Sequence, residues 1–204
     1  MKLLTIDTAT PRPAVALHQP VVRAERRLEP QSAFRDCVPA IQDLLTEHDL
    51  EWDQLDGLAI PGGPGSFTGL RIGATIAITL AELHGIGLYA PSTLLAVSEL
   101  CARADQLRVC ASFDARRGRR YVAVCEREEV RGWRLVHGPA DLEPEDTTVF
   151  CRGVAEVRLE DAAPDGGTIA AALGSLVEQA PERHRVADAS RFELNYTRPG
   201  VDVS

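Results

Sequence analysis

Apolar positions recur along the chain with helical and strand periods, and the densest apolar stretch lies at 58–83. A short apolar run opens this stretch and leads into a turn of glycine and proline at 61–65. Residues 67–84 then have the composition of a helix, and Ser66 stands just before it, where a hydroxyl accepts from free backbone N–H groups. The pattern therefore predicts a strand, a tight turn and a nearly all-apolar helix in succession.

Small residues occupy every fourth position of this predicted helix: Gly69, Gly73, Ala77 and Ala81. Such a row forms a flat ridge that lets another helix approach closely. Glycine inside a helix costs about 1 kcal/mol relative to alanine, and tight packing would offset that cost. Because a helix that is apolar almost all round must be buried, we expect it to pack partly against another protein.

The remaining pattern predicts further strands and helices on both sides of this stretch. Strands are expected at 2–7, 14–17, 21–28, 56–60, 86–90, 109–114, 121–125 and 148–151, and helices at 32–47, 92–104 and 168–178. Pro39 lies inside the first of these helices and should kink it or limit its first turns. The polar tail at 191–204 is expected to be an extended surface segment.

The two halves of the chain repeat a short unit. A strand ending in Asp7 is followed by a strand that begins at Ala14, and Asp114 and Tyr121 have the same seven-residue separation. A repeated strand–Asp–turn–strand unit predicts two related α/β lobes, at 1–104 and, smaller and divergent, at 105–204.

Composition narrows the classes of function. The chain has 204 residues, 45% of them hydrophobic, and a net charge of −8, which would repel nucleic acid over most of the surface. The five cysteines form no CxxC motif, so buried reduced thiols in the cytoplasm are expected. No signal peptide is expected. No membrane span is expected either, because the apolar helix carries Arg71, threonines and glycines.

The glycine-rich turn at 62–65 has two interpretations. Free N–H groups before a helix favour an anion. The turn is neither a P-loop nor a G-x-G-x-x-G fingerprint, however, and this favours a tight turn without ligand. Ser66 lacks the glycines of a nucleophile elbow, which favours a helix cap. The five histidines lie far apart in sequence, and we expect no metal site.

Carboxylates at strand ends face the cleft in two-lobed nucleotide-binding folds, where they position metal or water. The cleft candidates are therefore Asp7, Gly63, Gly65, Ser66 and Asp114. The turn after Asp7 contains no glycine through which backbone could approach phosphate. We accordingly expect structural hydrogen bonding there and no ATP hydrolysis.

One basic cluster stands out on this acidic chain: Arg116, Arg117, Arg119 and Arg120. It could contact RNA phosphates, or it could be a solvated hairpin tip. The sequence leaves both interpretations open.

Several motifs together resemble the bacterial TsaB (YeaZ) family. They are GGPGSFTGLRIG at 62–73, TIDTAT at 5–10, PSTL at 91–94 and DARRGRRY at 114–121, with a weak echo in NYTRP at 195–199. The resemblance implies an actin/Hsp70-like two-lobed fold (ASKHA, ribonuclease H-like) of mixed sheets flanked by helices.

The resemblance also implies a function. Family members belong to the machinery that puts threonylcarbamoyl on the adenosine next to the anticodon of ANN-decoding tRNAs (t6A). They are not catalytic, and they pair with TsaD, a paralogue with metal-binding histidines and the transfer activity. TsaC makes threonylcarbamoyl-AMP, TsaE is an ATPase partner, and tRNA binds through the complex.

The family's interface uses its first two helices, here 32–47 and 67–84. The expected interface residues are Phe34, Val38, Ile41, Leu45, Gly69, Leu70, Ile72, Gly73, Ile76, Ala77, Leu80 and Ala81. Ala33 stands where many relatives have a histidine. No cofactor is expected in the chain, and nucleotide at the cleft or at the complex interface is left open.

Two alternatives compete with a scaffold that activates TsaD. One is an enzyme, an ATPase or a glycoprotease-like hydrolase, using Asp7, Asp114 and Ser66. The other is a homodimer through the same helices in the absence of TsaD. Bulky replacements at Gly73 or Ala77 are expected to abolish pairing while the monomer stays folded.

Overall fold

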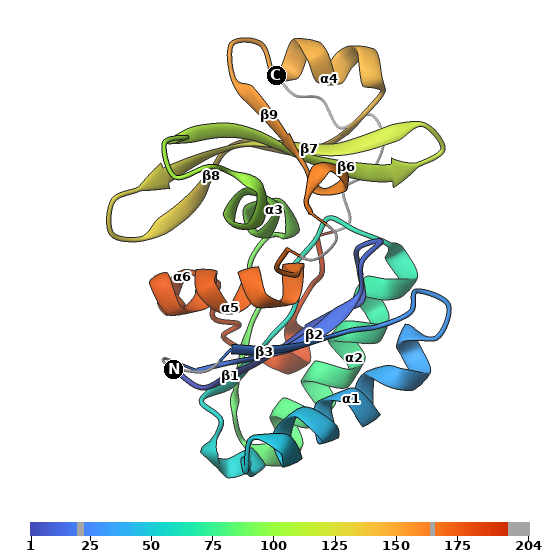
Figure 1. Ribbon diagram of the computed structural model, residues 1–204, viewed down its shortest axis with the longest axis vertical. Helices are drawn as coiled ribbons and strands as arrows, with labels where there is room; N and C mark the ends of the chain where they lie inside the picture. Colours follow the sequence, from blue (N-terminus) through green and yellow to red (C-terminus); the bar gives the residue numbers. More distant parts are fainter. Residues whose placement is uncertain (20–22, 164–165, 196–204) are drawn as a thin grey trace.

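The computed structural model describes residues 1–19, 23–163 and 166–195, which form stacked layers of helices and sheets (Figure 1). From the top of Figure 1 downward lie α4 (Pro144–Phe150), one sheet, α3 (Thr93–Cys101) with α5 (Ile169–Gln179), a second sheet, and finally α1 (Ala33–Glu47) with α2 (Phe67–His84). Each sheet therefore has helices on both faces, as an α/β chain with apolar helix stripes requires.

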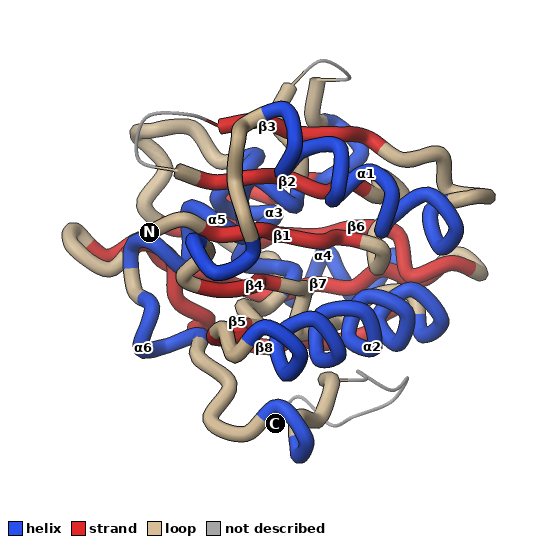
Figure 2. The backbone as a smooth tube through the Cα atoms, turned by 90° about the horizontal axis from the view of Figure 1, so that it is seen from below, coloured by secondary structure: helices blue, strands red, loops and turns tan. Residues whose placement is uncertain are grey.

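The first sheet has the strand order β3-β2-β1-β4-β5. Its strands are β1 (Leu3–Asp7), β2 (Ala14–His18), β3 (Arg23–Arg27), β4 (Gly57–Ala59) and β5 (Gly87–Tyr89). β1, β2 and β3 pair antiparallel, whereas β1, β4 and β5 pair parallel. Figure 2 shows α1 and α2 side by side across this sheet, with α1 near β2 and β3 and α2 near β4 and β5.

The second sheet repeats this arrangement. Its order is β8-β7-β6-β9, built from β6 (Arg108–Arg116), β7 (Arg119–Glu128), β8 (Gly132–Leu142) and β9 (Ala155–Arg158). β6 pairs antiparallel with β7, β7 antiparallel with β8, and β6 parallel with β9, which matches β1, β2, β3 and β4. The mixed-sheet α/β class and the repeated hairpin are thus confirmed.

The last part of the chain returns to the first sheet. α5 packs against β1 and β2 on the face opposite α1 and α2. After α6 (Pro181–His184), the segment 185–195 runs along the edge at β5, where the Val186 N–H donates to the Leu88 carbonyl at 2.8 Å. The described part of the expected surface tail is therefore attached to the fold; residues 196–204 lie outside the described residues.

Most predicted elements are found, with a few differences. α2 spans the expected residues, and the Ser66 side chain accepts from the Gly69 N–H at 3.3 Å, which confirms the cap. α1 continues through Pro39. The strand expected at 148–151 is wrong, because those residues end α4 and form the turn after it, and β8, β9 and α4 were not expected.

Short 3-10 turns join several elements: η1 (Trp52–Gln54), η2 (Leu159–Asp161) and η3 (Ala189–Arg191). Within the described residues, no helix combines the length and the apolar character that crossing a bilayer would require.

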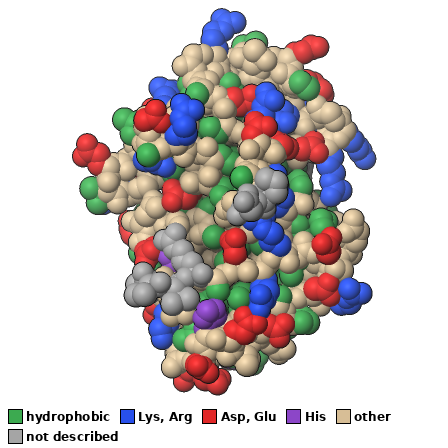
Figure 3. Space-filling view, in the orientation of Figure 1, with side chains coloured by type: hydrophobic (Ala, Val, Ile, Leu, Met, Phe, Trp, Pro, Cys, Tyr) green, Lys and Arg blue, Asp and Glu red, His purple; other side chains and the backbone are tan. Residues whose placement is uncertain are grey.

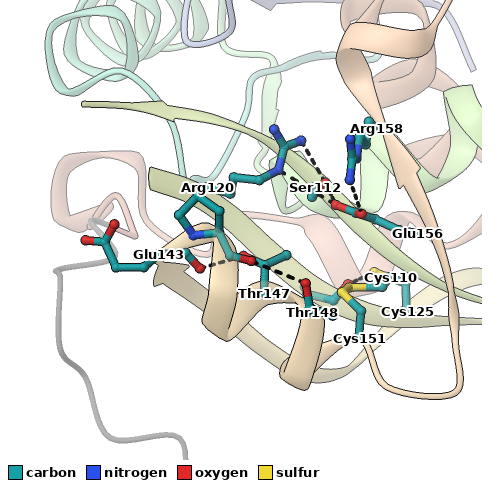
Figure 4. Close-up of a disulfide and its surroundings, with 12 residues drawn as sticks. Cys110, Ser112, Arg120, Cys125, Glu143, Thr147, Thr148, Cys151, Glu156 and Arg158 are labelled. Carbon is teal, nitrogen blue, oxygen red and sulfur yellow. Dashed lines mark hydrogen bonds and ion pairs between the residues drawn. A yellow bond between two sulfur atoms is a disulfide. The ribbon is translucent and has the colours of Figure 1, made fainter. Parts of the chain in front are cut away.

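Cys110 and Cys151 form a disulfide, which corrects the expectation that all five cysteines are reduced (Figure 4). The bond joins β6 to the residue that follows α4 and so attaches α4 to the outer face of the second sheet. Cys37 and Cys125 are free and buried, and burial raises the pKa of their thiols to about 12 and about 11, so neither is a reactive thiolate at neutral pH.

We expect reduction of this disulfide to destabilise the chain. The bond spans 41 residues, and the chain-entropy model gives up to about 4 kcal/mol for a closed loop of that length. Urea unfolding of one preparation with and without dithiothreitol measures the difference. Equal transition midpoints, with mass spectrometry showing two more thiols after reduction, would contradict the expected stabilisation.

Candidate functional site

The glycine-rich turn is filled by the chain's own backbone. Gly63 has a left-handed φ of 103°, and a Cβ atom there would overlap the carbonyl oxygen of Asn195. The Asn195 N–H in turn donates to the Gly62 carbonyl at 2.9 Å. The glycines therefore allow close approach of the C-terminal segment, which corrects the view that this part of the turn is open to an anion.

The first turn of α2 lies equally close to the turn between β1 and β2. A Cβ atom on Gly69 would overlap the carbonyl oxygen of Thr8, and the Thr8 hydroxyl donates to the Gly69 carbonyl at 2.7 Å. A Cβ atom on Gly73 would lie 2.8 Å from that same hydroxyl oxygen. The small-residue ridge of α2 thus packs within the chain, and bulky replacements at Gly73 or Ala77 would disturb the monomer itself.

A cavity of about 450 Å³ opens between the two lobes at the start of α2. Three cleft candidates line it: Gly65, Ser66 and Asp114. The Tyr121 hydroxyl, on β7, donates to the Gly65 carbonyl at 3.3 Å and so bridges the two lobes at this cavity. Gly63 is not part of the lining, because Asn195 lies against it.

Asp7 lies beneath the cavity and not in its wall. Its side chain is fully buried, one carboxylate oxygen accepts from the N–H groups of Ala9 (2.8 Å) and Thr10 (3.1 Å), and the other accepts from the Thr10 hydroxyl. Burial raises the pKa of Asp7 to about 6, although these hydrogen bonds oppose the shift. Asp7 therefore closes its own turn, as expected for a structural group.

Asp114 repeats part of this arrangement in the second lobe. Its carboxylate accepts from the Arg116 N–H at 2.8 Å, two residues on, as Asp7 does from Ala9. Unlike Asp7, Asp114 is exposed and lines the cavity. The described residues contain no group of three or more His, Cys, Asp or Glu side chains arranged to hold a metal ion.

Within the described part of the chain, two arginines of the basic cluster are paired with carboxylates and two are not. The Arg119 Nε donates to Asp141 at 2.7 Å, and the Arg120 guanidinium contacts Glu160 at 2.9 Å. These two arginines are held by carboxylates of the chain, which corrects the idea that all four are available to RNA. Arg116 and Arg117 are exposed. On the face drawn in Figure 3, basic and acidic side chains are interspersed.

The residues expected at the partner interface also divide into two groups. The chain itself buries seven of the twelve: Ile41, Leu45, Gly69, Leu70, Gly73, Ala77 and Ala81. The structure thus places them in the fold and not on a free surface. Phe34 is 69% exposed, Val38 is exposed, and Ile72, Ile76 and Leu80 are half-buried.

The accessible residues of this expected set, together with Leu83, define a surface on α1 and α2 that we call the helix face. Ile72, Ile76, Leu80 and Leu83 follow one another at helical spacing along one flank of α2. Leu83 is 72% exposed and was not among the expected interface residues, although this spacing could have identified it. The helix face consists of Phe34, Val38, Ile72, Ile76, Leu80 and Leu83.

The opposite flank of α2 is covered by the chain. η3 packs against α2. Phe192, Leu194 and Ile78 of α2 are partly buried and pack against the hydrophobic core between the first sheet and the helices α1 and α2. Among the described residues, the segment 185–195 therefore covers one flank of α2, whereas on the helix face Ile72, Ile76 and Leu80 stay half-buried and Leu83 exposed.

Comparisons with known proteins agree with this architecture. The family model described as "TsaD: tRNA N6-adenosine threonylcarbamoyltransferase" matches residues 33–137. The "tRNA threonylcarbamoyladenosine biosynthesis protein TsaB" of Escherichia coli (strain K12) is 39% identical over 150 residues, which cover 71% of this chain and 64% of that protein. The protein of the same name from Bacillus subtilis (strain 168) is 35% identical over 127 residues, covering 61% and 55%. The chain belongs to the TsaB (YeaZ) family.

A solved structure supports the fold over nearly the whole chain. It is the crystal structure of an uncharacterized protein with similarity to peptidase YEAZ from Pseudomonas aeruginosa, with a TM-score of 0.80, 26% identity, and coverage of 97% of this chain and 99% of that one. The matched segment spans less than two thirds of each of the two TsaB relatives.

We expect Gly69→Ala to destabilise the monomer. The added methyl group would overlap the Thr8 carbonyl, and overpacking of this kind costs about 1–3 kcal/mol. Thr75→Ala, at an exposed position of α2, should change stability by no more than about 0.5 kcal/mol. Urea unfolding measures both variants, and equal stabilities would show that the contact with Thr8 is not tight.

Asp7→Asn should stabilise the chain in a pH-dependent way. Because the folded-state pKa of Asp7 is raised from 3.8 to about 6, the wild type loses stability as the pH rises through this interval, by about 3 kcal/mol at most. An Asn side chain keeps the acceptor for the Ala9 and Thr10 N–H groups and never ionises. The advantage of Asn over Asp should therefore be full at pH 8 and smaller at pH 5. Urea unfolding at both pH values tests this, and an advantage that does not vary with pH would contradict it.

Proposed function

We propose that this chain is a non-catalytic activating subunit of the tRNA t6A modification machinery, in the cytoplasm, and that it binds a TsaD-type partner through the helix face. The observation that carries the proposal is the partly exposed apolar flank of α2, which ends at the exposed Leu83, beside the exposed Phe34 and Val38 of α1. The names of the TsaB relatives support the pathway. TsaE and tRNA would bind to the complex that this chain forms with the TsaD-type partner.

The helix face has the properties of a binding surface. It is contiguous, it lies on two rigid helices, and it presents aromatic and branched aliphatic side chains, the kind enriched at interface centres. Exposed apolar residues scattered singly would carry no such meaning. Here Phe34 and Ile72 line one groove between the two helices, and the α2 stripe continues from Ile72 to Leu83.

An independent enzyme is the weaker proposal. Of the residues it would use, Asp7 lies outside the cavity with its carboxylate bound to its own turn. Ser66 caps α2 through its side-chain oxygen. Neither is arranged to activate water or a nucleophile.

A homodimer through the same face competes directly with the heterodimer. Both would bury the helix face, so the proposal predicts that addition of the TsaD-type partner dissociates any homodimer. Light scattering of the chain alone and with an equimolar amount of partner distinguishes the two assemblies.

We expect Leu83→Asp to weaken binding of the TsaD-type protein of the same organism by at least about 30-fold, because a charge would be buried in an apolar contact. Calorimetric titration measures the affinity. Leu107→Asp is the matched control, since Leu107 is 65% exposed but lies before β6, outside the helix face.

The outcome against the proposal is equally definite. If Leu83→Asp binds the partner as tightly as wild type does and supports t6A formation in a reconstituted reaction, the helix face is not the binding surface.

A further inference from the structure

A groove of about 320 Å³ lies between the first turns of α1 and α2. Phe34 and Ile72 contribute apolar side chains to its lining, and Thr8, Thr10 and Pro11 of the β1–β2 turn also line it. It is continuous with the helix face, because Phe34 and Ile72 belong to both. An apolar side chain of a partner fits this part of the groove.

The groove also receives a residue from the other lobe. Arg116, the last residue of β6, is the only charged residue among the described residues that line it. No hydrogen bond or ion pair of its guanidinium with a described residue is present, whereas Arg119 and Arg120 of the same hairpin are held by carboxylates. On a chain whose net charge is −8, an arginine with no such partner among the described residues therefore borders this groove. The groove is lined partly by apolar side chains and partly by the polar side chains of Gln31, Ser66 and Thr68.

The backbone around Arg116 is arranged to keep it there. Arg116 has a left-handed φ of 69°, which is unfavourable for a residue with a Cβ atom, and the strand pairing shifts between Asp114 and Arg116. The Asp114 carboxylate accepts the Arg116 N–H at 2.8 Å and so stabilises this conformation. The positive φ values of Arg116, Arg117 and Gly118 are those of a tight hairpin between β6 and β7, and this hairpin fixes the position of Arg116 beside the groove.

We propose that the partner-binding surface extends across both lobes to Arg116, and that the partner places in this groove an apolar side chain next to a carboxylate. The apolar group packs against Phe34 and Ile72, and the carboxylate pairs with the Arg116 guanidinium. The inference rests on the proposed function, because it extends the helix face. An RNA phosphate fits less well, since the groove itself contains one arginine and a phosphate would make no contact with the apolar side chains of Phe34 and Ile72.

Charge reversal at two adjacent arginines tests this proposal. Arg116→Glu should weaken binding of the TsaD-type protein about tenfold or more in calorimetric titration, because it removes one partner of a desolvated charge pair. Arg117→Glu makes the same charge change at the next residue, also at positive φ, but Arg117 does not line the groove. It should change the affinity less than threefold.

A second variant excludes misfolding as the cause. Arg116→Gly removes the side chain and suits the positive φ, so its thermal unfolding midpoint should match wild type while its affinity falls as in Arg116→Glu. The wild-type affinity should also fall more steeply with added salt than that of Arg116→Gly, because the charge pair is screened.

Each outcome decides one proposal. Suppose that Arg116→Glu and Arg117→Glu weaken binding equally or not at all, while Leu83→Asp abolishes it. The proposal that the binding surface extends to Arg116 is then refuted, and the proposal that the partner binds the helix face is supported. If Arg116→Glu leaves the affinity for the TsaD-type protein unchanged but weakens tRNA binding by the assembled complex, the groove binds RNA and the inference is overturned.

Discussion

The contact between the start of α2 and the β1–β2 turn determines the geometry of the whole cleft region. The Ser66 N–H donates to the Ala9 carbonyl at 2.9 Å, and the Thr8 hydroxyl donates to the Gly69 carbonyl, so helix and turn are joined in both directions. Within the turn, the Asp7 carboxylate accepts hydrogen bonds from the N–H groups of Ala9 and Thr10. Because a Cβ atom at Gly69 has no room, α2 has one rotation about its axis, and that rotation decides which flank faces outward.

The two lobes use the same hairpin for different purposes. In both, an aspartate at the end of the first strand accepts the N–H group two residues on. The Asp7 side chain is fully buried and does not line the cavity, whereas the Asp114 side chain is exposed and does. The repeat therefore supplies a buried structural carboxylate in one lobe and a surface hairpin that carries Arg116 in the other.

The sequence predicts what depends on local pattern and misses what depends on distant partners. α2 and its cap follow from apolar periodicity and from Ser66. β8 escapes prediction because it is an edge strand with Pro139 inside and few buried positions, so it shows no alternation. The carboxylates that hold Arg119 and Arg120 lie 22 and 40 residues away, on β8 and η2, and no spacing rule connects them.

The small-residue ridge of α2 and the helix face are different sides of the same helix, and the sequence pattern does not distinguish them. A row of glycine and alanine indicates close approach but does not say which backbone approaches. Here the approaching backbone belongs to Thr8 on one side of α2, and the segment 185–195 covers a second side. The β1–β2 turn with Thr8 and the segment 185–195 are both attached to the first sheet, which fixes their positions against α2. The flank from Ile72 to Leu83 is consequently the one that the described residues leave partly accessible, and in the proposed complex its bulky residues, not the glycines, contact the partner.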